Sequence, residues 1–302
     1  MSESELFGGL YLGCPQWHQR QWNESIFPSE CTAKDALKSY AQVFNAVEGN
    51  TTFYATPPRQ VIERWASDTP TSLRLVLKFP QAVTHERGLD QGALDIALRF
   101  IEHMQPLGPR RSYTLIQLPA RFDERHFERL YRFLQSLPRE CPSGVSLHYA
   151  VELRAPSLTR PSQGSSGLFE EVNDLLSAAL TERGWMDTRP LRSAPEPWDE
   201  PTRLARSRKP NLPVYPIGLG PAPMVRFVAH PDVESNRPWL NDWVAVFDRW
   251  LTEGRRPFFF AHYPGETQAP QVADLFYKLL REKRSNCPER PVWPSERQLK
   301  LF

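Results

Sequence analysis

Charged side chains stand at the ends of several apolar segments of this sequence. The segment VEGN places Glu48 directly after Val47, and LVLKFP carries Lys78 between Leu77 and Phe79. Carboxylates and amines can transfer protons, and amines can bind anionic groups. These residues become a candidate site if the fold brings the segment ends together.

The same pattern recurs farther along the chain. AVELR contains Glu152 and Arg154, MVRFV contains Arg226, and FFFAH ends at His262. Successive side chains of a strand face opposite sides, so the apolar neighbours of each charged residue share one face and the charged residue takes the other. We predict that the charged faces point into a closed sheet, where barrel enzymes assemble their sites. The residues expected to face inward are Glu48, Asn50, Lys78, Gln117, Glu152, Arg154, Asp187, Arg226, His230 and His262.

The elements that must position these residues alternate along the whole chain. Apolar strand-like segments are followed by segments of helical period, which is typical of parallel strands joined by crossover helices. Each helical segment has a single apolar stripe, as expected for an outer layer packed on a closed sheet. We therefore predict an α/β fold, a TIM-like (β/α) barrel of eight parallel strands that forms a single domain over residues 1–302. The strand segments are 10–14, 46–50, 74–80, 113–119, 146–154, 184–188, 224–230 and 257–264.

Two long segments interrupt this rhythm. They are APSLTRPSQGSSG at 155–167, after the fifth strand, and the Pro- and Arg-rich segment at 189–216, after the sixth. The 30 prolines of the chain favour stiffened loops over a flexible linker between domains. We predict that both segments form lids or walls over the carboxyl ends of the strands.

Composition argues against several classes of protein. A net charge of +2 provides no strong field to attract nucleic acid or an anionic membrane. The four cysteines have no C-x-x-C spacing, which argues against a zinc site or a disulfide framework. The N-terminus lacks a signal-peptide pattern and no apolar segment is long enough to span a bilayer, so we predict a cytoplasmic protein. Without a Gly-rich phosphate loop, a dinucleotide fingerprint or paired histidines, no cofactor and no metal are expected.

Some residues near the segment ends have two interpretations each. Trp17 can stack on a ring-shaped ligand or simply pack against its neighbours. His85 can contact a ligand or form a hydrogen bond within its loop. Arg189, and Arg208 with Lys209, can bind an anion or remain solvated. The whole set of strand-end charges also has a structural interpretation, as an ion network that satisfies itself and closes the barrel.

The sequence resembles a known family in several ordered motifs. LGCPQWHQRQW, VEGNTTFYATP, LKFPQAVTH, LIQLPARF, AVELR, DTRP and FFFAHYP together resemble the YecE-like family, a domain of unknown function numbered 72, and most closely its YecE subgroup. The resemblance covers residues 8–283 and leaves 284–302 as a C-terminal tail. It implies a TIM-like barrel with a polar cavity at the carboxyl ends of the strands. Gln16 stands where many members have glycine, and Ala261 with His262 where many have an FNN-like strand. The family has no established reaction, so the chemistry stays open.

Two functional hypotheses follow. The first is a metal-independent hydrolase, isomerase or lyase that uses acid–base chemistry on a small polar, anionic metabolite. Here Lys78, Arg154 and Arg226 neutralise a carboxylate or phosphate, and a desolvated Lys78 would also permit imine formation. The residues predicted for catalysis are Glu48, Lys78, Glu152 and His262, and those for substrate binding are Trp17, Asn50, Tyr54, His85, Gln117, Arg154, Asp187, Arg189 and Arg226.

The second hypothesis is a non-catalytic barrel that binds a small molecule or docks a protein partner. Glycoside cleavage by a carboxylate pair and a metal-dependent hydrolase or isomerase are lesser alternatives. Nucleic acid and membrane are not expected as partners under either hypothesis.

Overall fold

A closed barrel of eight parallel strands forms the centre of the molecule. The structure, a computed structural model, describes residues 7–23, 25–161, 167–294 and 296. β1 pairs with both β2 and β8, which closes the ring. The predicted single-domain, TIM-like (β/α) barrel is thereby confirmed. The strands are β1 (Tyr11–Cys14), β2 (Ala46–Gly49), β3 (Arg74–Lys78), β4 (Arg111–Gln117), β5 (His148–Glu152), β6 (Glu182–Asp187), β7 (Met224–Val228) and β8 (Phe258–His262).

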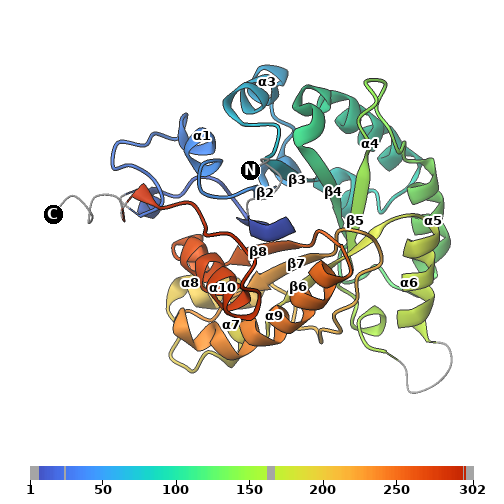
Figure 1. Cartoon of the computed structure of the whole chain (residues 1–302). Coiled ribbons are helices and arrows are strands. Elements are labelled where there is room, and N and C mark those ends of the chain that lie inside the picture. Colours follow the sequence, from blue (N-terminus) through green and yellow to red (C-terminus); the bar gives the residue numbers. More distant parts are fainter. Residues whose placement is uncertain (1–6, 24, 162–166, 295, 297–302) are drawn as a thin grey trace.

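Helices lie around the outside of this barrel (Figure 1). α4 begins where the side chain of Asp90 accepts a hydrogen bond from the backbone N–H of Ala93, which satisfies one of the unpaired donors at a helix start. The helices are α1 (Ala36–Tyr40), α2 (Thr51–Tyr54), α3 (Arg59–Asp68), α4 (Gln91–His103), α5 (Phe127–Ser136), α6 (Leu168–Ala178), α7 (Arg189–Ser193), α8 (Glu200–Arg208), α9 (Arg237–Thr252) and α10 (Ala269–Lys283).

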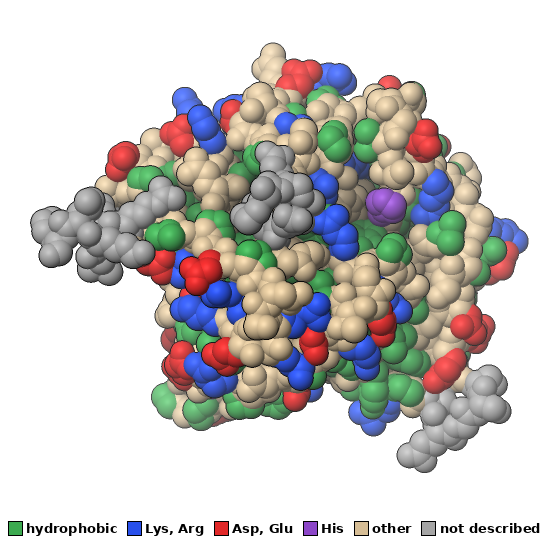
Figure 2. All heavy atoms as spheres, in the orientation of Figure 1, with side chains coloured by type: hydrophobic (Ala, Val, Ile, Leu, Met, Phe, Trp, Pro, Cys, Tyr) green, Lys and Arg blue, Asp and Glu red, His purple; other side chains and the backbone are tan. Residues whose placement is uncertain are grey.

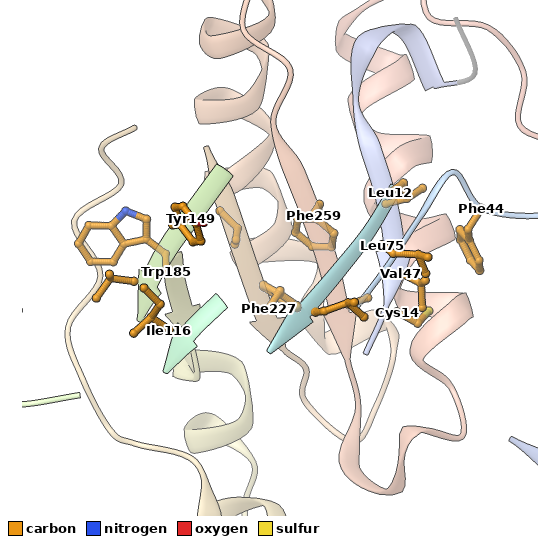
Figure 3. Packing of buried hydrophobic residues seen from close by; sticks show 14 of the residues in the cluster. Leu12, Cys14, Phe44, Val47, Leu75, Ile116, Tyr149, Trp185, Phe227 and Phe259 are labelled. Carbon is orange, nitrogen blue, oxygen red and sulfur yellow. The ribbon is translucent and has the colours of Figure 1, made fainter. Parts of the chain in front are cut away.

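The outward faces of the strands form a continuous apolar core with these helices. Val47, Leu75, Phe227 and Phe259 belong to it and are buried (Figure 3). The ring of Phe259 on β8 stacks on Phe276 of α10, with ring centroids 3.8 Å apart. Each fully buried side chain of this size contributes about 1.5–3 kcal/mol, so this layer holds the helices on the barrel.

The inward faces change character along the strands. A separate buried cluster of apolar side chains fills the barrel interior at the amino-terminal side, with Ala46, Val76, Ala150, Met224 and Phe260 among its members. Two residues farther along the same strands, the next inward positions carry charged or polar groups. This step of two follows from the alternation of side chains in a strand. The resulting pairs are Ala46 and Glu48, Val76 and Lys78, Leu115 and Gln117, Ala150 and Glu152, Met224 and Arg226, and Phe260 and His262.

The long segment after β6 is more ordered than a stiffened loop. It contains α7 and α8, and α8 begins at Asp199, whose side chain accepts a hydrogen bond from the N–H of Thr202. The hydroxyl of Thr188 donates to the carbonyl of Pro210, which ties the two ends of this segment together. Of the other long segment, after β5, residues 162–166 lie outside the described residues.

The surface carries both signs of charge. Acidic and basic side chains are interspersed over the face in Figure 2. None of the described helices is long and apolar enough to cross a membrane.

Candidate functional site

Arg226 lies at the centre of an ion cluster inside the barrel. Its Nε and Nη2 donate to Oε2 and Oε1 of Glu48, each at 2.7 Å, and its Nη1 donates to Oε2 of Glu152. β7 supplies the guanidinium, while β2 and β5 supply the carboxylates. All three side chains are sealed, at 1% exposure or less. Removing one partner from such a buried pair costs about 3–5 kcal/mol, because the other charge is left uncompensated.

The two carboxylates are held in their ionised form. Burial alone would raise the pKa of Glu48, but Arg226, then Lys78 and His262, outweigh it and hold that pKa well below its usual range. Burial likewise opposes the ionisation of Glu152, yet the neighbouring Arg154 and Arg226 lower its pKa to about 2. Arg154 Nε donates to Glu152 Oε1 at 2.5 Å. Both acids are therefore charged at neutral pH and already bound by cations.

Lys78 projects from the end of β3 beside this cluster. Its Nζ donates to Gln117 Oε1 at 2.9 Å and lies 3.4 Å from Glu48 Oε1. Burial, followed by the charge of Arg226, lowers the pKa of Lys78 to about 7 and outweighs the attraction of the two glutamates. The Lys78 amine can therefore lose its proton near neutral pH, whereas a lysine of ordinary pKa stays almost fully protonated there.

His262, at the end of β8, connects the cluster to the segment after α8. Its Nε2 lies 3.3 Å from Glu48 Oε2, and its Nδ1 lies 3.5 Å from Lys209 Nζ and 3.7 Å from Glu266 Oε1. Burial, followed by Arg226, lowers the pKa of Lys209. Glu48 thus contacts three groups from three different strands: Arg226, Lys78 and His262.

A cavity of about 620 Å³ lies over the carboxyl ends of the strands. Strand ends supply its floor, α2 and the residue before it supply one wall, and α8 supplies another. Glu48 and Glu152 do not line it, because they lie beneath the cations that they bind. The lining residues are Gln16, Asn50, Phe53, Tyr54, Lys78, Gln117, Arg154, Glu200, Pro201, Leu204, Ala205, Arg208, Lys209, Arg226, Val228, His262, Tyr263, Gly265 and Glu266.

The structure brings most of the predicted site residues to this cavity. Asn50 reaches it while its Nδ2 donates to the carbonyl of Pro15 at 2.8 Å, and Tyr54 stands at the edge, 75% exposed. The predicted residues that line the cavity are Asn50, Tyr54, Lys78, Gln117, Arg154, Arg226 and His262, and those directly below it are Glu48 and Glu152.

Asp187 and Arg189 lie elsewhere. Asp187 does not face inward as predicted: it points away from the barrel, where Arg189 Nη2 and the indole Nε1 of Trp243 on α9 each donate to its Oδ2 at 2.8 Å. The physical reason is parity, since Asp187 shares its face of β6 with Trp185, which packs in the outer core. Neither residue lines the cavity. They join β6 to α9 instead.

Three further residues also lie outside the cavity lining. The Trp17 ring packs edge-on against Trp65, with ring centroids 4.9 Å apart. This agrees with the interpretation of Trp17 as a packing residue. His85 borders a separate hollow, and its ring centroid lies 5.1 Å from that of Phe53. Burial, followed by the charge of Arg154, lowers the pKa of His85. His230 lies beyond the end of β7, where its backbone N–H donates to Asn236.

Several cavity residues were not singled out from the sequence. Glu266 and Phe53 belong to loops or short helices with no periodic pattern, and the role of Lys209 was left open between an anion site and a solvated surface. One signal was present: Asp199 followed by Pro201 is the pattern of a helix start, and the helix it begins carries the chain to Lys209.

No three His, Cys, Asp or Glu side chains in the described part of the chain are arranged to hold a metal ion. The four cysteines are free thiols, and three of them are buried.

The fold and the site together define a TIM-like barrel protein whose strand ends carry an ion cluster beneath a cavity. Residues 11–298 match the family described as "Protein of unknown function DUF72", and the chain belongs to this family. It is 32% identical over 294 residues to the UPF0759 protein YecE of Escherichia coli K12, an alignment that covers 96% of this chain and 99% of that protein. A shorter match, 31% identical over 80 residues, relates it to the UPF0759 protein YunF of Bacillus subtilis 168, with 26% of this chain and 27% of that protein covered.

Solved structures of the same family share the fold. A DUF72 family protein of Enterococcus faecalis V583 superposes with a TM-score of 0.66 at 14% identity, covering 94% of this chain and 98% of that one. A DUF72 family protein of Thermotoga maritima MSB8 gives a TM-score of 0.64 at 20% identity, covering 90% and 99%. At these identities the likeness concerns the fold alone.

Proposed function

We propose that this protein is an acid–base enzyme that acts on a small anionic metabolite in the cavity above the barrel, with Lys78 as the group that transfers the proton. One observation carries the proposal. Cationic side chains face the cavity, whereas Glu48 and Glu152, which pair with three of them, lie beneath the floor. The lining still carries more cations than acids, so a ligand meets an excess of positive charge. The cations are Lys78, Arg154, Arg208, Lys209 and Arg226, and the acids are Glu200 and Glu266.

An anionic group is the ligand chemistry that these cations favour. On the cavity floor, Arg154 is the guanidinium that a ligand can reach, because its side chain is 18% exposed while that of Arg226 is 1% exposed. Arg208, an exposed residue of α8, supplies a guanidinium at the wall. Lys209 adds a second cation at the wall. Charge-assisted hydrogen bonds from such groups to a carboxylate or phosphate are roughly twice as strong as neutral ones.

Lys78 is the best-placed proton-transfer group. A base works best when its pKa lies near the working pH, and the pKa of Lys78 is lowered to about 7. Glu48 and Glu152 are poorer bases, because their low pKa values keep them ionised and the cations occupy their oxygens. We assign them to positioning Arg226 and Lys78, and do not propose glycoside cleavage by this pair. His262, which lines the cavity beside Lys209, would be a second proton carrier.

The proposal is tested with a panel of small carboxylates and phosphates. Thermal shift of the wild-type protein detects binding, and proton NMR of the same mixtures detects turnover. Arg154→Gln should weaken binding about tenfold, or ~1.4 kcal/mol. Lys78→Met should leave binding within several-fold and reduce turnover by about 10²-fold or more, the range expected when a general base is lost.

Exposed positions provide matched controls. Arg132→Gln and Lys38→Met make the same changes on surface helices and should alter neither property. Turnover that survives Lys78→Met would refute the role of Lys78. Stabilisation by anions without turnover of any of them would favour the non-catalytic barrel, and no stabilisation by any anion would remove the proposed ligand class.

A further inference from the structure

Lys78 is held both at its backbone and at its side-chain amine. The hydroxyl of Thr52 donates to the Lys78 carbonyl at 2.8 Å and accepts from the Lys78 N–H at 3.1 Å. The Phe53 ring lies 5.9 Å from Nζ, and Gln117 holds Nζ at 2.9 Å. Both ends of the side chain are therefore held, and its amine is presented to the cavity.

From this geometry we infer that Lys78 is a nucleophile that forms an imine with the carbonyl carbon of a small oxo acid or phosphorylated carbonyl compound. The inference rests on the proposed function, because it keeps the same cavity and the anionic ligand. It gives the neutral Lys78 amine a bond to the carbonyl carbon in place of a direct proton transfer. An amine held at the cavity floor, with cations beside it for the anionic part of the substrate, is an arrangement that suits imine chemistry.

The surroundings of Nζ suit both the amine and its product. Attack requires the neutral amine, and desolvation together with a neighbouring cation is the established way to make a lysine nucleophilic. The iminium that follows is positively charged, and Glu48, 3.4 Å from Nζ, already provides the compensating charge. Gln117 Oε1 already accepts a hydrogen bond from Nζ and can accept one from the iminium N–H.

The covalent step balances without any redox partner. The nitrogen lone pair attacks the carbonyl carbon, a C–N bond forms, and the carbonyl π pair moves to oxygen. A proton passes from nitrogen to that oxygen, which gives a carbinolamine. A proton from solvent then adds to the hydroxyl, the C–O bond breaks, water leaves, and the nitrogen lone pair completes the C=N bond.

The substrate class follows from the charges around the amine. Arg154 and Lys209 line the same cavity as Lys78, so a carboxylate or phosphate on the substrate can be bound while the carbonyl carbon meets Nζ. The cavity of about 620 Å³ falls within the range of sites for small metabolites. An uncharged ketone would lack this anchoring.

Reductive trapping tests the inference. The full-length protein is incubated at pH 7 with pyruvate, dihydroxyacetone phosphate or acetone, each with sodium cyanoborohydride, and then analysed by intact mass and peptide mapping. Hydride adds to the iminium carbon, so the expected mass gain is that of the carbonyl compound less one oxygen atom. Labelling should fall on Lys78 at least about tenfold faster than on exposed Lys38, because a lysine of ordinary pKa is almost fully protonated at pH 7.

Two lysine variants and the three carbonyl compounds together show whether Lys78 forms the imine. Lys78→Arg keeps a positive charge and should lose the site-specific label, whereas Lys38→Met should keep it. Pyruvate and dihydroxyacetone phosphate separate carboxylate from phosphate anchoring, and acetone should label Lys78 far more slowly than either. Equal labelling of Lys78 and Lys38, or equal rates with acetone, would overturn the imine. If either result is found while anions still stabilise the protein and Lys78→Met still reduces turnover, imine formation is refuted. The proposed function then remains supported.

Discussion

At the scale of single residues, Glu48 is the group on which the site depends. One carboxylate binds Arg226, lies 3.4 Å from Lys78 and lies 3.3 Å from His262. Such networks are costly to bury and are stable only when every charge has a partner. The same buried cations keep the glutamates ionised, so acid should weaken the cluster through its carboxylates.

The contribution of Glu152 to the free energy of unfolding should depend on pH in a direction that can be measured. Its pKa is about 2 in the fold, below its ordinary value of 4.5, so its contribution to stability is fully present above about pH 4.5 and is lost as pH falls toward 2. Glu152→Gln should lower the free energy of unfolding at pH 7 by about 3–5 kcal/mol. It should also flatten the decline of that free energy between pH 4.5 and 2, measured by urea unfolding at several pH values.

Glu128→Gln is the matched control for this prediction. Glu128 is an exposed glutamate that pairs with Arg132 on the surface of α5, where such pairs contribute about 0.2–1 kcal/mol. It should reproduce the wild-type pH profile. An unchanged slope in Glu152→Gln would show that other carboxylates cause the acid sensitivity.

Residue-level sequence reasoning located the cluster because of the apolar neighbours of its members. Val47 and Leu77 belong to the outer core, which forces Glu48 and Lys78 inward. Asp187 was placed inward for its polarity, although Trp185 on the same face requires the outward side. Its partner Trp243 is 56 positions away, beyond the reach of any local pattern.

At the scale of elements, the strands were predictable and the wall of the cavity was not. All eight predicted strand segments overlap the observed strands, because each is an apolar segment bounded by turns. The sixth begins at Glu182, two residues before the predicted start. The sequence of α7 and α8 predicts a loop, because it is rich in proline and arginine and has little apolar periodicity.

The contact between β6 and α9 gives a prediction that separates stability from function. Asp187→Asn should weaken the hydrogen bonds from Arg189 and Trp243 and lower the free energy of unfolding by about 2–3 kcal/mol. Because these side chains do not line the cavity, the affinity for a stabilising anion should stay within about twofold. Urea unfolding and ligand titration check the two expectations, and a large loss of affinity would place Asp187 in the site after all.

At the scale of the whole molecule, the two ends of the described chain meet on the outside of the barrel. The ring of Phe7 contacts Tyr277 of α10, whose hydroxyl donates to the carbonyl of Pro288 at 2.7 Å. Trp293 is buried, and Arg290 lies over its ring at 4.4 Å. The segment after α10, which the sequence suggested to be a tail, therefore packs against the barrel at least as far as Trp293.

Shortening the chain should show this contribution. A chain that ends at Arg284 loses the buried Trp293 and the ion pair of Arg290 with Asp274, and its free energy of unfolding should fall by about 3 kcal/mol. A chain that ends at Glu296 keeps these contacts and should be more stable than the chain that ends at Arg284 by about this amount. Chemical denaturation compares the three, and equal stability of the shorter chain would show that the segment is dispensable.

Different elements supply the floor and the wall of the cavity, and this has a consequence for how ligand choice can change among related barrels. The floor of charges is anchored by the ring of strands, whereas Glu200, Leu204 and Lys209 come from one segment whose two ends are tied together at Thr188 and Pro210. Replacing this segment with its counterpart from a relative should therefore change which ligand binds while Lys78 stays in place on the floor.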